Sequence, residues 1–135
     1  MRLFAIVLSW ACLVFGADKN SVINGVWRAQ VDGLPALVIT VSDEGGDLAG
    51  AVLFYLIRRD AGQPPKASPG IPEPLFNLGF DGKTLDFRMS HRRAHGARTA
   101  NDPPVHFQLR ITGPDEGLLM REGKESDAIR VSRDK

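Results

Sequence analysis

The side chains best suited to binding an anionic group lie between residues 88 and 98. This stretch, RMSHRRAHGAR, is strongly basic in a chain whose formal net charge is only +1, and it contains Arg88, His91, Arg92, Arg93, His95 and Arg98. Guanidinium groups bind carboxylates, phosphates and sulfates through paired N–H donors, so one interpretation is an anion-recognition rim. The alternative is a solvated loop whose charges only keep the protein soluble.

A metal site in this stretch is not expected. His91 and His95 are four residues apart, a spacing that brings two ligands together only on a helix. Gly96 and the pair Pro103-Pro104 oppose a helix, and the flanking arginines would repel a cation.

Signals for catalysis are weak along the whole chain. No serine lies in a Gly-x-Ser-x-Gly elbow, and no Gly-rich phosphate loop or nucleic-acid motif occurs. We therefore expect a protein that is not an enzyme and uses no cofactor. The alternative is a small hydrolase-like enzyme with polar side chains converging at a rim near His91, His95 and Tyr55.

The first sixteen residues have the layout of a secretory signal peptide. A positive start is followed by an apolar run of thirteen residues, Leu3 to Phe15, and then by a small, polar segment. A membrane-spanning helix needs about 20 apolar residues, so this run is too short. We expect cleavage after Gly16, which removes the only cysteine, Cys12. The predicted product is a single domain of residues 17–135, secreted to the periplasm or the exterior, with no stable membrane anchor.

The charge of this domain excludes two classes of partner. Of the 17 Lys+Arg and 16 Asp+Glu in the chain, only Arg2 lies in residues 1–16, which leaves 16 of each sign. A net charge near zero argues against nucleic-acid binding and against general binding to membrane surfaces. The expected partner is a small hydrophobic or anionic molecule.

The domain alternates between strand-like runs and turns, with no capped helical period of ten or more residues. The eight runs are Gly25 to Val31, Leu34 to Val41, Leu48 to Ile57, Leu75 to Phe80, Thr84 to Ser90, Val105 to Thr112, Gly117 to Glu122 and Asp127 to Ser132. The sequence therefore predicts an all-β fold, an eight-stranded antiparallel up-and-down β-barrel.

The lengths of the connections predict two different ends of this barrel. Short turns follow the second, fourth and sixth runs, whereas long connections follow the third and fifth. In an up-and-down meander alternate connections share an end, so the long loops lie together at a mouth. Function tends to reside on such loops, which makes the basic stretch and Tyr55 candidate rim residues.

Alternation along the runs predicts an apolar interior. Its expected members are Trp27, Ala29, Val31, Leu37, Ile39, Val41, Val52, Phe54, Leu56 (or the neighbours Leu53 and Ile57), Phe76, Leu78, Phe80, Leu85, Phe87, Met89, Val105, Phe107, Leu109, Ile111, Leu118, Met120, Ile129 and Val131. The opposite face carries Arg28, Gln30, Thr40, Asp86, Arg88, Ser90, His106, Gln108 and Arg110. We interpret it as a solvent-exposed surface on which Asp86 and Arg88 face His106 across the ladder, giving a surface ion pair that contributes little.

An eight-stranded barrel is just wide enough to be filled by side chains or to hold one small ligand. If it holds a ligand, the candidate interior residues are Phe54, Phe76, Phe87, Met89 and Phe107, and the ligand should be lipophilic. If it is filled, the protein is a structural or protein-interaction module.

Gly25-Val26-Trp27 at the start of the first run, followed by LVITV and DLAGAV, resembles the calycin superfamily of lipocalins, fatty-acid-binding proteins and avidins. The resemblance implies a lipocalin- or streptavidin-like barrel that binds a small lipophilic or amphipathic anionic ligand at its mouth. It also implies that Trp27 closes the other end, with Arg121 or Arg130 packed over the indole. The Thr-Asp-Tyr motif of lipocalins and the polar lining of avidins are absent from the sequence.

Overall fold

The computed structural model describes residues 18–90 and 103–135, and these residues are almost entirely β-structure. A short 3₁₀ helix, η1 (Lys19–Val22), precedes ten strands. The strands are β1 (Gly25–Val31), β2 (Leu34–Glu44), β3 (Asp47–Arg58), β4 (Lys66–Pro69), β5 (Glu73–Pro74), β6 (Phe76–Phe80), β7 (Thr84–Met89), β8 (Val105–Gly113), β9 (Glu116–Arg121) and β10 (Lys124–Arg133). The predicted all-β class is confirmed. Over the two described ranges, no helix has the length and apolar character needed to cross a bilayer.

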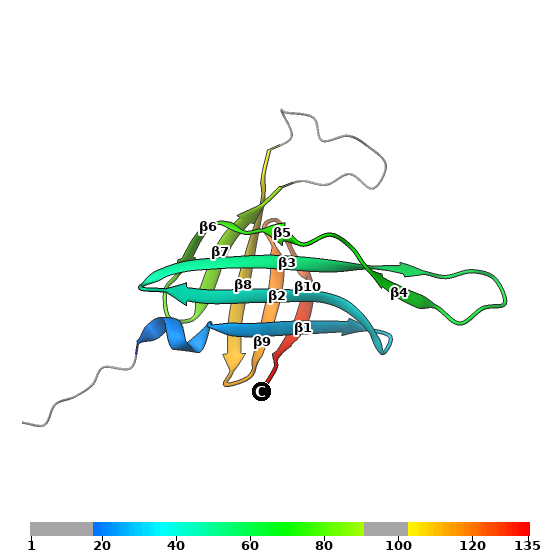
Figure 1. The fold of residues 1–135 in the computed structure, drawn as a ribbon, viewed down its shortest axis with the longest axis horizontal. Helices are drawn as coiled ribbons and strands as arrows, with labels where there is room; N and C mark the ends of the chain where they lie inside the picture. Colours follow the sequence, from blue (N-terminus) through cyan, green and yellow to red (C-terminus); the bar gives the residue numbers. More distant parts are fainter. Residues whose placement is uncertain (1–17, 91–102) are drawn as a thin grey trace, which may run out of the picture.

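The strands form one curled, half-barrel sheet in the order β4-β3-β2-β1-β10-β9-β8-β7-β6, with β5 also paired to β3. All of these pairings are antiparallel. In Figure 1, β1, β2 and β3 run across the view while β7, β8 and β9 run up and down it. The sheet therefore turns a corner where β1 meets β10, and its two limbs enclose the core.

The count of eight strands is not reproduced, because the Pro-rich connection after β3 contributes β4 and β5. β4 extends the hairpin with β3, from Tyr55 opposite Pro69 to Arg58 opposite Lys66. β5 covers a different part of the same edge, with Glu73 opposite Val52. Both strands are edge segments, where a proline that lacks an N–H donor is tolerated.

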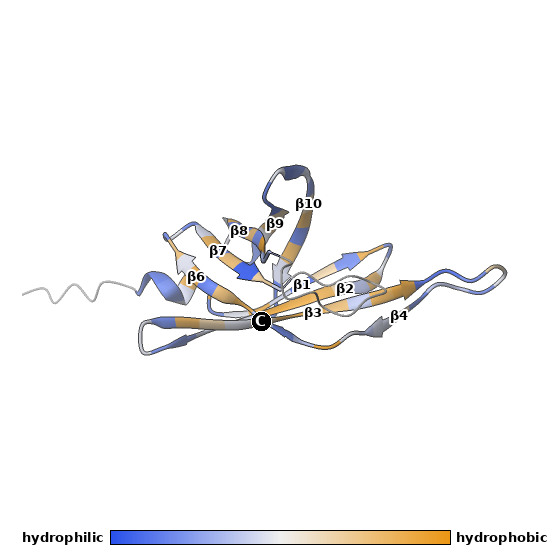
Figure 2. Ribbon diagram, turned by 90° about the horizontal axis from the view of Figure 1, so that it is seen from above, coloured by the Kyte–Doolittle hydropathy of each residue, from blue (hydrophilic) through white to orange (hydrophobic). Residues whose placement is uncertain are grey.

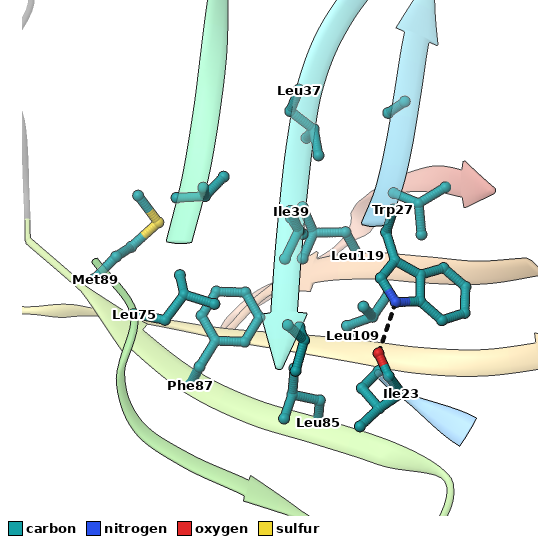
Figure 3. Close-up of a cluster of buried hydrophobic side chains, with 14 of the residues drawn as sticks. Ile23, Trp27, Leu37, Ile39, Leu75, Leu85, Phe87, Met89, Leu109 and Leu119 are labelled. Atoms are coloured by element: carbon teal, nitrogen blue, oxygen red, sulfur yellow. Dashed lines mark hydrogen bonds between the residues drawn. The ribbon is translucent and has the colours of Figure 1, made fainter. Parts of the chain in front are cut away.

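The core joins residues from both limbs of the sheet. Trp27, Leu37 and Ile39 from β1 and β2 pack with Leu85, Phe87, Leu109 and Leu119 from β7, β8 and β9 (Figure 3). The side chains of Trp27, Ile39, Leu85 and Leu109 are 0% exposed. Alternation predicted most of these inward positions, because the strands that supply them carry apolar residues on one face only.

β9 has the opposite orientation to the one predicted. Leu119 lies opposite Leu109 and belongs to the core, whereas Met120 lies opposite Gln108 on the outer face. Leu118 shares this outer face, so the prediction that Leu118 and Met120 point inward was wrong. Three consecutive apolar residues offer no alternation, and the register with β8 decides which of them faces the core. Met120 is also buried, at 6% exposed, although it is not part of the core cluster.

Phe76 was also assigned to the wrong face. It lies opposite Arg88 on the outside of the sheet, and the register between β6 and β7 shifts before Gly79. Asn77, between them, has a φ of 52°, which marks a bulge. The bulge reverses the alternation, so Leu75 is buried in the core in place of Phe76.

One end of the molecule is closed by η1 and the short turns. Asp18 caps η1 by accepting a hydrogen bond from the backbone N–H of Asn20 at 3.1 Å. The buried Asn20 side chain donates to the carbonyl of Gly46, in the β2–β3 turn, at 3.5 Å. Arg133 links η1 to the β8–β9 turn, since its backbone N–H donates to the Asp115 carbonyl. We call this the closed end (Figure 1, side of η1).

Trp27 lies at the closed end, as the resemblance implied, but the basic residue over it is Arg133. The indole N–H donates to the Ile23 carbonyl at 2.9 Å (Figure 3), and the Arg133 guanidinium carbon lies 4.8 Å from the ring centroid. Trp27 and Arg133 are direct cross-strand partners. Arg130 is on the outer face and Arg121 is at the far end of β9, so the expectation for both residues was wrong.

Replacing Arg133 should therefore destabilise the fold. The guanidinium stacks on Trp27 and also donates to the carbonyls of Val22, Ser21 and Asn24. We expect Arg133→Ala to lower the free energy of unfolding by about 1 to 3 kcal/mol, measured by urea denaturation. The matched control Arg130→Ala removes an exposed guanidinium and should change it by less than about 0.5 kcal/mol. Equal effects of the two variants would contradict the role given to Arg133.

The β6–β7 turn predicts a specific dependence of stability on pH. Asp81 Oδ1 accepts backbone N–H bonds from Thr84 at 2.7 Å and Lys83 at 2.8 Å. These bonds lower the pKa of Asp81 below 3.8, with a smaller contribution from the charge of Lys19. A lowered pKa stabilises the fold at pH values above the unfolded pKa, and this stabilisation is lost as pH falls through the folded pKa.

We expect Asp81→Asn, which keeps an acceptor but cannot ionise, to melt below the wild type at pH 7. The difference in melting temperature should shrink as the pH falls to about 2. Asp60→Asn, in the exposed β3–β4 loop, is the control and should leave the melting temperature nearly unchanged at both pH values. A difference for Asp81→Asn that does not depend on pH would contradict the assignment.

Candidate functional site

Apolar side chains of β3 run from the core into solvent at the end opposite η1. Val52, Phe54 and Leu56 alternate on the face of β3 that covers the core, with Val52 opposite Ile39 and Phe54 opposite Leu37. Their exposed fractions are 2%, 40% and 60%. Phe54 and Leu56 therefore do not lie in an enclosed interior, because β3 runs past the end of the core.

Two further apolar residues are exposed at this end. Val31, at the end of β1, was predicted to point inward but is 40% exposed, because β1 also outruns the core. Ile71 is 67% exposed and follows Gly70, whose N–H donates to the Phe54 carbonyl at 2.8 Å. We call Val31, Phe54, Leu56 and Ile71 the open-end apolar residues. The β3–β4 hairpin extends beyond the rest of the sheet here, and its β3 strand is strongly hydrophobic (Figures 1 and 2).

The same face of β3 continues into positive charge. Arg58 follows Leu56 by two residues, and its cross-strand partner in β4 is Lys66. Both side chains are exposed. Like charges directly opposite each other in an antiparallel pair are destabilising, so this pair favours an anion between them. The neighbouring Arg59 is instead paired with Asp32 at 2.5 Å.

The other interior candidates belong to the core. Phe87 and Met89 are buried, and Phe107 is half-buried. The rings of Phe87 and Phe107 stack with centroids 5.8 Å apart and an interplanar angle of 10°. These three residues pack the interior next to the open end, whereas Phe76 is on the outer face.

The predicted rim is not assembled in the described residues. Arg88 is exposed on the outer face of β7, opposite His106. Tyr55 is half-buried, and by alternation it faces the other side of β3 from Phe54 and Leu56. The remaining rim candidates, His91, Arg92, Arg93, His95 and Arg98, lie outside the described residues, as does the predicted signal peptide.

The outer face of β7, β8 and β9 holds a polar cluster around His106. Its Nε2 lies 2.9 Å from Asp86 and its Nδ1 lies 3.1 Å from Glu122. The Gln108 amide also donates to Asp86 at 2.9 Å. The prediction that Asp86 and Arg88 face His106 is confirmed, and Glu122 is a further partner of the ring. Carboxylates lie against both ring nitrogens, so neither nitrogen of His106 is open to a substrate.

The acidic turn between β2 and β3 has a structural explanation. Asp43 Oδ1 accepts the Gly46 N–H at 2.7 Å, and this bond lowers the pKa of Asp43. Across residues 18–90 and 103–135, no three His, Cys, Asp or Glu side chains are grouped so that they could hold a metal ion.

Glu73 is the one buried charged side chain in the described part of the chain. It lies on β5 opposite Val52 and is not without an interaction partner. This burial was not predicted, because Glu73 lies between prolines in a stretch predicted to be a loop.

A groove of about 600 Å³ lies on the outer surface where β1 meets β10 and was not predicted from the sequence. It is lined by Arg28, Gln30, Thr112, Glu116, Gly117, Leu118, Arg130, Val131, Ser132 and Asp134. Arg28 is paired with Asp134 at 2.5 Å, while Arg130 makes no ion pair with any described residue. Two arginines and two carboxylates leave the groove formally neutral.

Comparisons with protein families, with curated proteins and with solved structures found no match to this chain. The function must therefore be argued from its own residues.

Proposed function

We propose that this protein is a secreted, non-enzymatic β-barrel-like binding protein for a small amphipathic anion. The observation that carries the proposal is the order of residues on one face of β3, from buried Val52 through exposed Phe54 and Leu56 to Arg58, with Lys66 opposite. An apolar tail would cover Phe54 and Leu56, and a carboxylate or phosphate head would lie between the two cations.

The energetics of this arrangement favour such a ligand. Fully burying a large apolar side chain contributes roughly 1.5 to 3 kcal/mol, and Phe54 and Leu56 have much of their surface still in water. An anionic head would also remove the repulsion between Arg58 and Lys66. A purely polar ligand would gain nothing from the two apolar side chains.

We also propose that the protein is a calycin-like barrel. β5 pairs with β3 and β6 pairs with β7, while Leu75 between them donates its N–H to the Gly50 carbonyl at 2.9 Å. If β5 and β6 are counted as one strand, and β4 as an extension of the β3 hairpin, the meander has eight strands and returns to β1 through β10. This count supports a lipocalin- or streptavidin-like topology.

A dansyl-labelled long-chain fatty acid tests the proposed site by fluorescence titration. We expect Leu56→Ser to weaken binding about tenfold, which corresponds to about 1.4 kcal/mol. The double variant Arg58→Ala, Lys66→Ala should weaken binding of the fatty acid but not of its neutral amide. Phe76→Ser is the control, because Phe76 is similarly exposed but lies on the outer face.

Two results would overturn the proposal. One is wild-type protein that does not bind the labelled fatty acid. The other is binding that weakens as much in Phe76→Ser as in Leu56→Ser, since this would place the fatty acid away from the open end.

A further inference from the structure

The groove on the outer surface lies at a seam where the first and last strands separate. β1 and β10 pair only through Trp27 with Arg133 and Arg28 with Ser132. A further bond, from the Asp134 N–H to the Val26 carbonyl at 2.8 Å, lies on the closed-end side of these pairs. The register would continue with Ala29 opposite Val131 and then with Gln30 opposite Arg130, the next hydrogen-bonding pair. Neither pair forms, so the two strands diverge there.

The backbone groups of Gln30 and Arg130 point into this seam. Successive residues of a strand direct their N–H and C=O groups alternately to the two neighbouring strands. Val26 bonds toward β10, so Gln30, four residues later, also points toward β10. Arg133 bonds toward the β8–β9 turn, so Arg130, three residues earlier, points the other way, toward β1. Each residue thus presents a donor and an acceptor that no described strand satisfies.

The side chains around these backbone groups are polar, and most of them make no hydrogen bond to another described side chain. Gln30, Thr112, Ser132 and Glu116 line the groove, and none of them bonds to another described side chain. Arg28 is held by Asp134, which leaves Arg130 as the available cation. The volume of about 600 Å³ is within the range of small-ligand sites.

We propose that this groove binds an extended peptide segment, which bonds to the separated edges of β1 and β10 at Gln30 and Arg130. An unpaired strand edge is a template for another strand, because main-chain bonds supply affinity and neighbouring side chains supply selectivity. The peptide should be polar, because the groove is formally neutral, with an acidic side chain directed toward Arg130. This site is separate from the open end and does not depend on the function proposed there.

The test begins with a phage-displayed library of random octapeptides selected on the full-length protein. We expect enriched peptides that carry an acidic residue and shift the backbone amide resonances of Gln30 and Arg130. Gln30→Pro removes the seam donor without removing a bond to β2, and it should weaken binding about fivefold to tenfold. Gln30→Ala keeps the N–H and is the matched control, with a change below about threefold.

A second measurement leaves the protein unchanged, which matters if Gln30→Pro fails to fold. N-methylation along a selected peptide should weaken binding at the residues whose N–H groups face Gln30 or Arg130 and should leave binding unchanged at residues outside the seam, because an N-methylated amide cannot donate. Leu56→Ser should leave peptide binding unchanged, so failure at the open end and failure at the seam are distinguishable.

The inference is overturned by any of three results. Selection could enrich no peptide, or Gln30→Pro and Gln30→Ala could weaken binding equally. The third result is that cellotetraose, a neutral oligosaccharide probe, shifts the Gln30 and Arg130 resonances while the selected peptides do not.

Discussion

The contact on which the rest of the structure depends is the one between Trp27 and Arg133. The indole donates to Ile23, and the guanidinium lies over the ring and reaches the carbonyls of η1 and the residues next to it. This contact joins the first strand, the last strand and the N-terminal 3₁₀ helix at a single point. β1 and β10 share only two residue pairs, so few hydrogen bonds hold the two strands together. The packing of Trp27 therefore supplies the stabilisation that this short ladder lacks.

Everything on the far side of that point is less constrained. On the inner face, β3 extends past the core, so Phe54 and Leu56 are exposed. On the outer face, β1 and β10 diverge between Gln30 and Arg130, which line the groove. Both candidate sites therefore arise from the same cause, a barrel-like sheet held tightly at one end. The short turns and η1 fix the closed end, and ligands are expected where the strands outrun their neighbours.

The sequence predicted those parts of the fold that depend on local pattern. The strand period, the apolar inner face of β2 and β7 and the position of Trp27 all follow from residues close together in the chain. It could not predict register. Phe76 reversed its face because of one residue, Asn77, and Leu119 was chosen over its apolar neighbours by its pairing with β8. Arg133 was missed for the same reason, since only the register of β10 against β1 places it opposite Trp27.

The candidate sites show why a count of charges in the sequence is a poor guide to binding. The basic stretch from Arg88 to Arg98 drew attention because its arginines are adjacent in sequence. In the described residues, the available cations are instead set by pairing. Arg59 is neutralised by Asp32, which leaves Arg58 beside Leu56, and Arg28 is neutralised by Asp134, which leaves Arg130 in the groove. In each case an ion pair between residues far apart in the sequence decides which of two arginines is available to a ligand. An arginine in this fold can therefore bind an anionic ligand only where no carboxylate of the protein already neutralises it.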